Sequence, residues 1–232
     1  MKLKLVLLFD IDGTLIKTGG VGMKAMEKSF QKVFHQKDGM KEISFAGSTD
    51  LGIFQESLKN LDLYDQYKNQ ESEFRKNYLN ELKGTIKDPN IPQEVLPGVF
   101  PFLEKIKEHE DIYTGLVTGN YKEGAKIKLE HFKLWDYFGE GAFGCDHEDR
   151  NILPAIALER IQEKGYQLPD KENIWIIGDT QKDTYCAHHN DLKSLILFTG
   201  FNTREEILNS KPTLTLENLE AYQEFLDIAY SE

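Results

Sequence analysis

Short, mostly apolar runs bounded by turn residues recur along the chain and predict β-strands. Strands of this kind, without a clear polar alternation, are typical of a parallel sheet that is buried on both faces. The runs cover residues 3–9, 112–117, 174–177 and 195–198.

Longer stretches between these runs carry apolar residues three and four positions apart, which predicts amphipathic helices. They cover residues 98–109, 121–134, 152–164 and 216–229. Strands that alternate with helices indicate βαβ units and a parallel sheet. We therefore expect the α/β fold class, with a Rossmann-like core.

The alternation is interrupted between residues 15 and 94, where no convincing buried strand is present. Helical patterns recur there instead, at 22–35, 50–60 and 64–83. Their aromatic residues lie at helical spacing and predict a separate core; they are Phe30, Phe34, Phe54, Phe74 and Tyr78. The segment 84–97 holds three prolines and predicts a return linker. We predict a small α-helical domain (15–94) inserted into a core made of residues 1–14 and 95–232.

Composition narrows the class of protein. The 232 residues carry a formal net charge of −11, which disfavours a nucleic-acid partner because phosphates would be repelled. Cys145 and Cys186 show no zinc or disulfide spacing, which suits a reducing cytoplasm. No apolar segment is long enough to span a bilayer, and the first apolar run ends at Asp10, too early for a signal peptide. We expect a cytoplasmic monomer or homodimer without a membrane partner.

Acidic and hydroxyl-bearing residues follow three of the predicted strands, where ligands bind in open α/β sheets. These residues are Asp10 and Asp12 after the first strand, Thr118, Gly119 and Asn120 after the second, and Asp179 and Asp183 after the strand at 174–177. Four carboxylates at one sheet edge would repel one another unless a cation lay among them. Oxygen ligands without clustered His or Cys favour Mg²⁺.

Other interpretations exist for Asp12-Gly13, for residues 20–25 and for two lysines that follow Thr118. Asp12-Gly13 is a favoured hairpin turn, but the glycine-rich segment 15–22 leads into a helix rather than a second strand. Residues 20–25 formally fit the dinucleotide fingerprint G-x-G-x-x-A, yet they do not directly follow a strand, so we favour a hinge. Lys122 and Lys126 either add positive field near Thr118 or lie on a solvated helix face.

The strand-end motifs together resemble the haloacid dehalogenase superfamily. The first motif matches D-x-D-G-T at 10–14, the second matches Thr118, and the fourth matches G-D-x-x-x-D at 178–183. Arg150 is the best match to the third motif, where Lys is commoner. The helical insertion occupies the position of that family's cap, and residues 45–50 (FAGSTD) resemble the phosphoglycolate-phosphatase-like branch.

The resemblance implies a role for each residue. Asp10 would be the nucleophile, and Asp12 the general acid and base, with its backbone carbonyl on Mg²⁺. Asp10, Asp179 and Asp183 would hold the metal through carboxylates, Asp183 directly or through water. Thr118 and Arg150 would bind the transferring phosphoryl group. The remaining candidate substrate-binding residues are Gly119, Asn120, Gly47, Ser48 and Thr49, of which the last three, with Asp50, belong to the predicted cap.

An Asp at position 12 fits cleavage of a P–O bond, because the leaving alkoxide needs a proton. The implied activity is Mg²⁺-dependent hydrolysis of a small phosphorylated metabolite. A sugar phosphomutase of the same superfamily remains an alternative, since phosphomutases share this Asp. A non-catalytic binding protein is disfavoured by the presence of Asp10.

Overall fold

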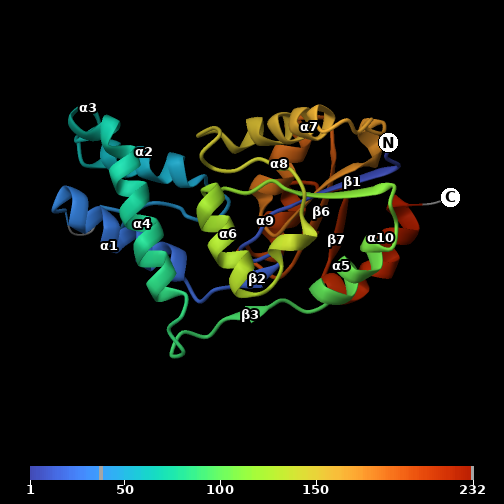
Figure 1. Cartoon of the computed structure of the whole chain (residues 1–232), viewed down its shortest axis with the longest axis horizontal. Coiled ribbons are helices and arrows are strands. Elements are labelled where there is room, and N and C mark those ends of the chain that lie inside the picture. The colour runs from blue at the N-terminus through green and yellow to red at the C-terminus, as the bar shows by residue number, and fades with distance from the viewer. Residues whose placement is uncertain (37–38, 231–232) are drawn as a thin grey trace.

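In the computed structural model, which describes residues 1–36 and 39–230, five parallel strands form the central sheet (Figure 1). Their order across the sheet is β4 (Ile112–Leu116), β1 (Leu5–Phe9), β5 (Ile174–Gly178), β6 (Lys193–Leu197) and β7 (Leu214–Leu216). The predicted α/β class and the four predicted strands are confirmed. The first strand begins at Leu5 rather than at residue 3.

The register of the sheet brings the functional strand ends together. Phe9 of β1 pairs with Leu116 of β4 on one side and with Ile177 of β5 on the other. The three strands therefore end at the same level. The residues that follow them share one edge of the sheet.

Helices cover both faces of the sheet, and alternate residues of β1 point to each face. Leu5, Leu7 and Phe9 belong to one core cluster, whereas Val6 and Leu8 belong to the other. The first cluster includes residues of α5 (Val99–Lys107), α6 (Lys122–His131) and α10 (Tyr222–Ala229), and the second includes residues of α7 (Leu153–Glu163) and α8 (Gln181–His189). Among the described residues, no helix is both long and apolar enough to cross a bilayer.

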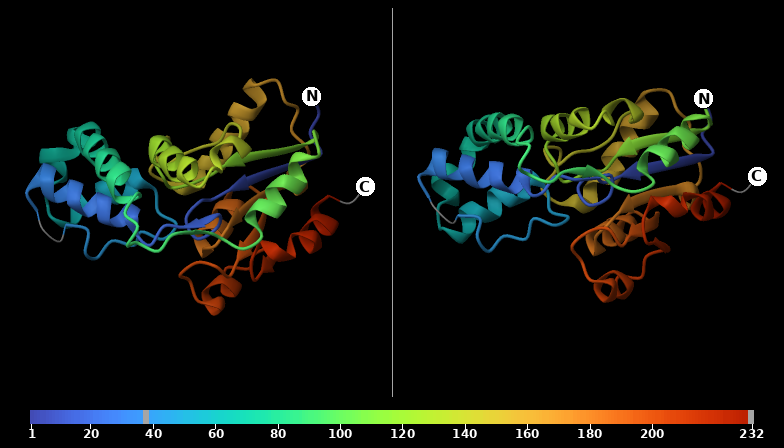
Figure 2. Two further views of the ribbon diagram at one scale, coloured as in Figure 1. Left: turned by 60° about the horizontal axis from the view of Figure 1, so that its bottom comes forward. Right: turned by 90° about the horizontal axis from the view of Figure 1, so that it is seen from below.

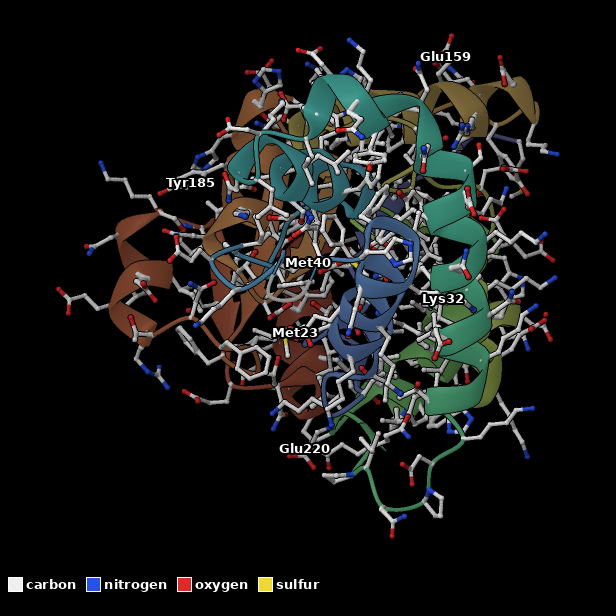
Figure 3. The ribbon with its side chains drawn as sticks, turned by 90° about the vertical axis from the view of Figure 1, so that its left-hand side faces the viewer. Met23, Lys32, Met40, Glu159, Tyr185 and Glu220 are labelled. Atoms are coloured by element: carbon white, nitrogen blue, oxygen red, sulfur yellow. The ribbon has the colours of Figure 1, made fainter. Side chains whose placement is uncertain are left out.

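A group of helices set apart from the sheet has its own core (Figures 1 and 2). It contains α1 (Val21–Phe34), α2 (Asp50–Asn60), α3 (Tyr64–Tyr67) and α4 (Glu71–Thr85). The five predicted aromatic residues pack together there, as expected. Figure 3 looks onto these helices, with Met23 and Lys32 of α1 labelled. We call this group the helical cap.

Two short strands connect the helical cap to the sheet domain. β2 (Ile16–Lys17) pairs antiparallel with β3 (Glu94–Val95). The sequence did not predict these strands, because two residues are too few to show an alternation. The chain thus enters and leaves the helical cap through paired segments.

Three further details differ from the prediction. The helix expected at 216–229 begins only at Tyr222, because Leu214–Leu216 forms the edge strand β7. The helix expected at 64–83 is broken by a 3-10 turn at Lys68–Gln70. The short helix α9 (Arg204–Asn209) was not anticipated.

Candidate active site

Three buried carboxylates meet at the carboxyl edge of the sheet. Asp10 follows β1, Asp179 follows β5, and Asp183 lies in the first turn of α8. Each offers one oxygen, and these oxygens all lie within 4.8 Å of one another. All three residues are at most 5% exposed. The predicted grouping of these acids is therefore present in the structure.

The electrostatics of this acid cluster favour a bound cation. Burial raises the pKa of Asp10 and of Asp179, and the neighbouring carboxylates raise both further. Arg150 opposes this effect but does not cancel it. A buried set of oxygen donors with excess negative charge suits a hard divalent cation such as Mg²⁺.

Two glycines allow the loops to close around Asp179. A Cβ on Gly13 would lie 2.3 Å from Asp179 Oδ2, and Gly13 has a φ of +86°. A Cβ on Gly200 would lie 1.8 Å from the same oxygen. Thr14 donates a hydrogen bond of 3.0 Å from its hydroxyl to Asp179 Oδ1. The Gly-Thr of the first motif thus positions a carboxylate 165 residues further along the chain.

Arg150 lies beside the acid cluster, at the start of a 3-10 turn that precedes α7. Its Nη2 is 2.5 Å from Asp183 Oδ1 and 3.3 Å from Asp10 Oδ1. Burial lowers the pKa of Arg150, but Asp10 and Asp183 outweigh burial and raise it, so the side chain stays charged. Its buried Nε has no hydrogen-bond partner among the described residues. A buried donor of this kind usually has a partner, such as a water or an ion.

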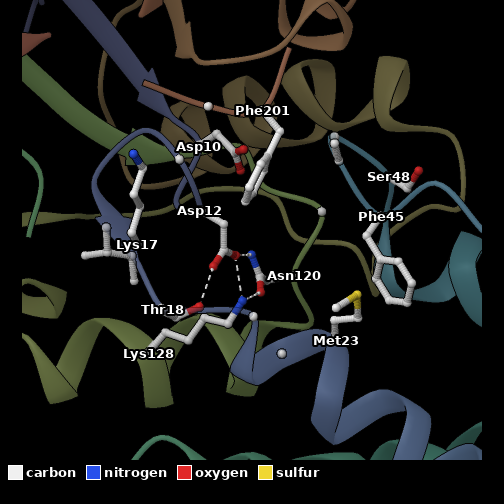
Figure 4. A pocket seen from close by; sticks show the side chains of 18 of the residues that line it. Asp10, Asp12, Lys17, Thr18, Met23, Phe45, Ser48, Asn120, Lys128 and Phe201 are labelled. Carbon is white, nitrogen blue, oxygen red and sulfur yellow. Dashed lines mark hydrogen bonds and ion pairs between the residues drawn. The ribbon is translucent and has the colours of Figure 1, made fainter. Parts of the chain in front are cut away.

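Asp12 does not join the acid cluster through its side chain. Its Oδ2 accepts hydrogen bonds from Lys128 Nζ at 2.6 Å and from Asn120 Nδ2 at 2.9 Å (Figure 4). Thr18 contributes a longer hydroxyl contact of 3.5 Å to Oδ1. The Asp12 side chain is 40% exposed. Two aspartates separated by one residue therefore occupy different environments.

Lys128 was not recognised from the sequence as a site residue. It lies on α6, is buried, and bonds both Asp12 and Asn120, the latter at 2.7 Å to Oδ1. A signal was available, because Lys128 shares the buried helix face of Gly124 and Ala125. A lysine on such a face is unusual unless it is paired.

The two lysines that the sequence did single out lie elsewhere. Lys122 and Lys126 are exposed. Lys126 pairs with Glu130 at 3.7 Å, and Lys122 lies over the ring of Phe143. The solvated-face interpretation of these lysines is confirmed.

The second motif joins the acid cluster to the helical cap. The Thr118 side chain lies close enough to Asp10 to oppose the rise of its pKa, and Thr118 Oγ1 accepts a bond of 2.9 Å from Asn120 Nδ2. The carbonyl of Gly119 accepts a bond of 2.6 Å from the amide of Asp50. A Cβ on Gly119 would lie 1.9 Å from the carbonyl oxygen of Ser48. The backbone of the second motif thus packs directly on the segment before α2.

The segment before α2 contains the predicted selectivity residues. Gly47 and Ser48 line the cavity described below, and Ser48 Oγ accepts a bond of 2.7 Å from Lys182 Nζ. Thr49 is buried; its hydroxyl accepts from the amide of Gly52 and donates to the carbonyl of Glu148. Of the three residues, Gly47 and Ser48 therefore face the cavity, while the Thr49 hydroxyl caps α2.

A cavity of about 890 Å³ lies between the acid cluster and the helical cap. Asp10, Asp12 and Asp179 line one side of it, together with Asn120 and Arg150. Residues of α1 and of the segment before α2 line the other side. A volume of this order is typical of pockets for small molecules.

An α/β sheet with acids at its carboxyl edge and a helical insertion defines a class of hydrolase. A family model described as "Haloacid dehalogenase-like hydrolase" matches residues 7–197, and the chain belongs to this family. The resemblance predicted from the motifs is thus confirmed.

Individual proteins of known name are similar to the chain at low identity. It is 22% identical over 219 residues to phosphoglycolate phosphatase 1 of Pseudomonas aeruginosa, which covers 94% of this chain and 78% of that protein. It is 25% identical over 199 residues to phosphoglycolate phosphatase of Aquifex aeolicus, with coverage of 84% and 85%. The crystal structure of β-phosphoglucomutase from Clostridium difficile has a TM-score of 0.73 at 18% identity, with coverage of 98% and 97%. This last likeness shows the fold alone.

Proposed function

We propose that this chain is a Mg²⁺-dependent phosphatase, which hydrolyses a small phosphate monoester through a phospho-Asp10 intermediate. The observation that carries the proposal is the cluster of buried carboxylates from Asp10, Asp179 and Asp183, with the Arg150 guanidinium beside it on the cavity wall. This arrangement combines a cation site with a donor for a phosphoryl oxygen. The names of the two curated relatives support the same class of reaction.

The carboxylates of Asp10 and Asp179, with the backbone carbonyl of Asp12, are the proposed direct ligands of Mg²⁺, and Asp183 completes the proposed metal site. The bound ion would offset the repulsion between these carboxylates and an incoming phosphate dianion. One oxygen of Asp183 bonds Arg150, and the other accepts from the amide and hydroxyl of Thr180. We therefore propose that Asp183 acts on the metal through water.

The reaction follows from the positions of the two first-motif aspartates. An Asp10 oxygen attacks phosphorus while the bond to the substrate alcohol breaks, and Asp12 gives its proton to the leaving oxygen. A water then attacks the phosphorus of phospho-Asp10, Asp12 takes the proton from that water, and inorganic phosphate is released. We propose that Thr118, Gly119 and Arg150 hold the phosphoryl oxygens.

We propose that residues 15–94 form a cap domain over a core of residues 1–14 and 95–232. The cap would exclude bulk water, and Gly47, Ser48 and Thr49 would help to select the organic part of the substrate. Asn120 would contribute by bonding Asp12 as well as substrate. The glycines before α1 fit a hinge, since Gly19 and Gly20 both have positive φ.

We also propose a cellular location, a type of partner and an oligomeric state for this protein. Both cysteines are free, which suits a cytoplasmic location. The net charge of −11 favours a metabolite over a nucleic acid as the partner. We propose a monomer or homodimer, which sedimentation or size-exclusion measurements would settle.

The test is phosphate release from a generic aryl phosphate, with Mg²⁺ and with a chelator. We expect release that requires Mg²⁺ and falls by at least about a thousandfold in Asp10→Asn, because covalent catalysis is lost. Activity that survives either change would contradict the proposal. A sugar phosphomutase would instead isomerise a sugar phosphate, require a bisphosphate primer and lose little phosphate to water.

A further inference from the structure

The cavity wall opposite the acid cluster is mostly apolar. Met23 and Met26 come from α1, Phe45 from the segment before α2, and Ile53 from α2. Phe201, from the loop after β6, adds an aromatic ring on the other side of the cavity, next to the acid cluster. The side of the cavity that would receive the organic part of a substrate thus offers hydrocarbon, sulfur and aromatic surface.

Phe201 is an exposed aromatic residue on a tethered loop. Its side chain is 94% exposed, although burial of such a ring would be favourable by about 2 kcal/mol. Thr199 donates a hydrogen bond to the carbonyl of Gly13, and Gly200 packs against Asp179. Figure 4 shows the ring of Phe201 beside Asp10 and Asp12, on the opposite side of the pocket from Met23 and Phe45. The loop is therefore fixed beside the acid cluster, and the ring of Phe201 is almost wholly exposed at the edge of the cavity.

The cap side of the wall is also accessible. Met23 is 42% exposed, and Phe45 is half-buried. Thioether side chains adapt to ligands of different shape and make favourable contacts with aromatic rings. A ligand between Phe201 and Met23 would remove apolar surface of both residues from water.

Two of the three cations that line the described part of the cavity are held in ion pairs with acidic side chains. Arg150 is paired with Asp183, and Lys128 is paired with Asp12. Lys17, the remaining cation among the described lining residues, lies directly across from Glu94 in the β2–β3 pairing. A second anionic group on the substrate would therefore find one cation in the described part of the wall that is not held in an ion pair, the exposed Lys17.

We infer that the substrate is the phosphate monoester of an alcohol that carries a sizeable apolar or aromatic group. The inference rests on the proposed phosphatase activity and specifies the substrate class of that site. The phosphoryl group would lie at Asp10, and the apolar group would lie between Phe201 and the methionines of α1. A two-carbon acid phosphate would leave most of the 890 Å³ cavity unfilled.

The test is a series of phosphate esters of primary alcohols: ethyl, butyl, hexyl and 2-phenylethyl phosphate, compared with 2-phosphoglycolate and glucose 6-phosphate. The chemistry of the leaving group is nearly constant along the alkyl series, so differences report binding of the organic part. We expect kcat/KM to rise about two- to fourfold per added methylene, as expected when that surface is buried. 2-Phosphoglycolate and glucose 6-phosphate should be poorer substrates than 2-phenylethyl phosphate.

Two variants test whether Phe201 and Met23 bind the apolar group of the substrate. Phe201→Ala and Met23→Ala should each lower the ratio of kcat/KM for 2-phenylethyl phosphate to that for ethyl phosphate, by about fivefold to tenfold. Leu208→Ala is the matched control, because Leu208 is 52% exposed on α9 and does not line the cavity. It should leave the ratio unchanged.

The outcomes separate this inference from the proposed function. If no ester is hydrolysed with Mg²⁺, both the phosphatase proposal and the inference fail. If esters are hydrolysed but kcat/KM does not rise with apolar size, or if 2-phosphoglycolate or glucose 6-phosphate is preferred, the inference is overturned and the phosphatase proposal stands. An unchanged ratio in both wall variants would likewise overturn it.

Discussion

The two aspartates of the first motif differ because of their neighbours. Asp10 lies among buried carboxylates, whereas Asp12 bonds Lys128 and Asn120 beside the cavity. The first environment suits a metal ligand and nucleophile. The second suits the general acid and base that we propose for Asp12. The different roles that we propose for Asp10 and Asp12 thus follow from the side chains that contact each of them.

Lys128 should act on the reaction by positioning Asp12. Lys128→Met keeps the length of the side chain but removes the ammonium that bonds Asp12. We expect kcat to fall about tenfold to a hundredfold with a smaller change in KM, because a misplaced proton donor slows the chemical step. Steady-state kinetics with an alkyl phosphate would measure the change.

The matched control for this variant is Lys126→Met, which alters an exposed lysine of the same helix. It should leave kcat within about twofold. A wild-type kcat in Lys128→Met would show that Asp12 needs no such partner. The position of Lys128 on the buried face of α6 was visible in the sequence, but its partner Asp12 lies 116 residues away, and the local pattern does not show that pairing.

Asp50 should make the stability of the protein depend on pH. Burial raises the pKa of this carboxyl to about 7, although Lys128 and the amide of Tyr121 oppose the shift. The other groups that influence it are Asp12, which raises the pKa, and Arg75, which lowers it. The unfolded chain loses this proton near pH 4. The folded state therefore holds more protons between about pH 4 and pH 7, and its free energy of unfolding falls as pH rises through that window.

Asp50→Asn removes the titrating carboxyl but keeps an amide oxygen that can accept the hydrogen bond from the amide of Tyr121. The comparison with this variant therefore isolates the effect of the Asp50 proton on stability. We expect the stability of the wild type relative to Asp50→Asn to decrease by roughly 2 kcal/mol from pH 5 to pH 7. Urea denaturation at several pH values would measure the difference. A difference that stays constant over that range would be inconsistent with the raised pKa.

At the scale of elements, the strands and their order in the sheet explain why the candidate site could be predicted from the sequence. Buried parallel strands give continuous apolar runs that are visible in sequence, and the carboxyl ends of such strands share an edge. Asp10, Thr118 and Asp179 therefore meet, because β1 lies between β4 and β5. The sequence could not show β2, β3 or β7, since pairs and triplets of residues carry too little pattern to distinguish strand from loop.

The start of α2 couples the helical cap to the core. The Thr49 hydroxyl caps this helix and bonds the carbonyl of Glu148 at 2.6 Å. We expect Thr49→Ala to lower the free energy of unfolding by about 1–2 kcal/mol, because both bonds are lost in a buried place. Thr49→Ser should retain most of the stability. Chemical denaturation would measure both, and full stability in Thr49→Ala would contradict the structural role.

At the scale of the whole molecule, a bound metal should stabilise the fold. The acid cluster joins residues that are far apart in the sequence, Asp10 with Asp179 and Asp183, and its repulsion is present in the folded state but not in the unfolded one. At a Mg²⁺ concentration about 100 times Kd, we expect Tm to rise by about 5–10 °C. Differential scanning calorimetry with and without Mg²⁺ would measure the shift.

Asp179→Asn should abolish most of this shift. Without metal, this variant should be at least as stable as the wild type, since one of three crowded carboxylates is removed. Asp65→Asn is the control, because Asp65 is exposed on α3 and distant from the cluster in sequence and fold. A Mg²⁺ shift that persists in Asp179→Asn would place the cation elsewhere.

The central claim is that Asp10 carries the phosphoryl group during turnover. The most direct measurement is peptide mapping by mass spectrometry, after acid quenching of the enzyme during turnover of an alkyl phosphate with Mg²⁺. The account predicts a phosphoryl adduct on Asp10, formed with the burst of released alcohol and absent from Asp10→Asn. A phosphoryl adduct on another residue, or a burst of alcohol with Asp10 unmodified, would contradict it.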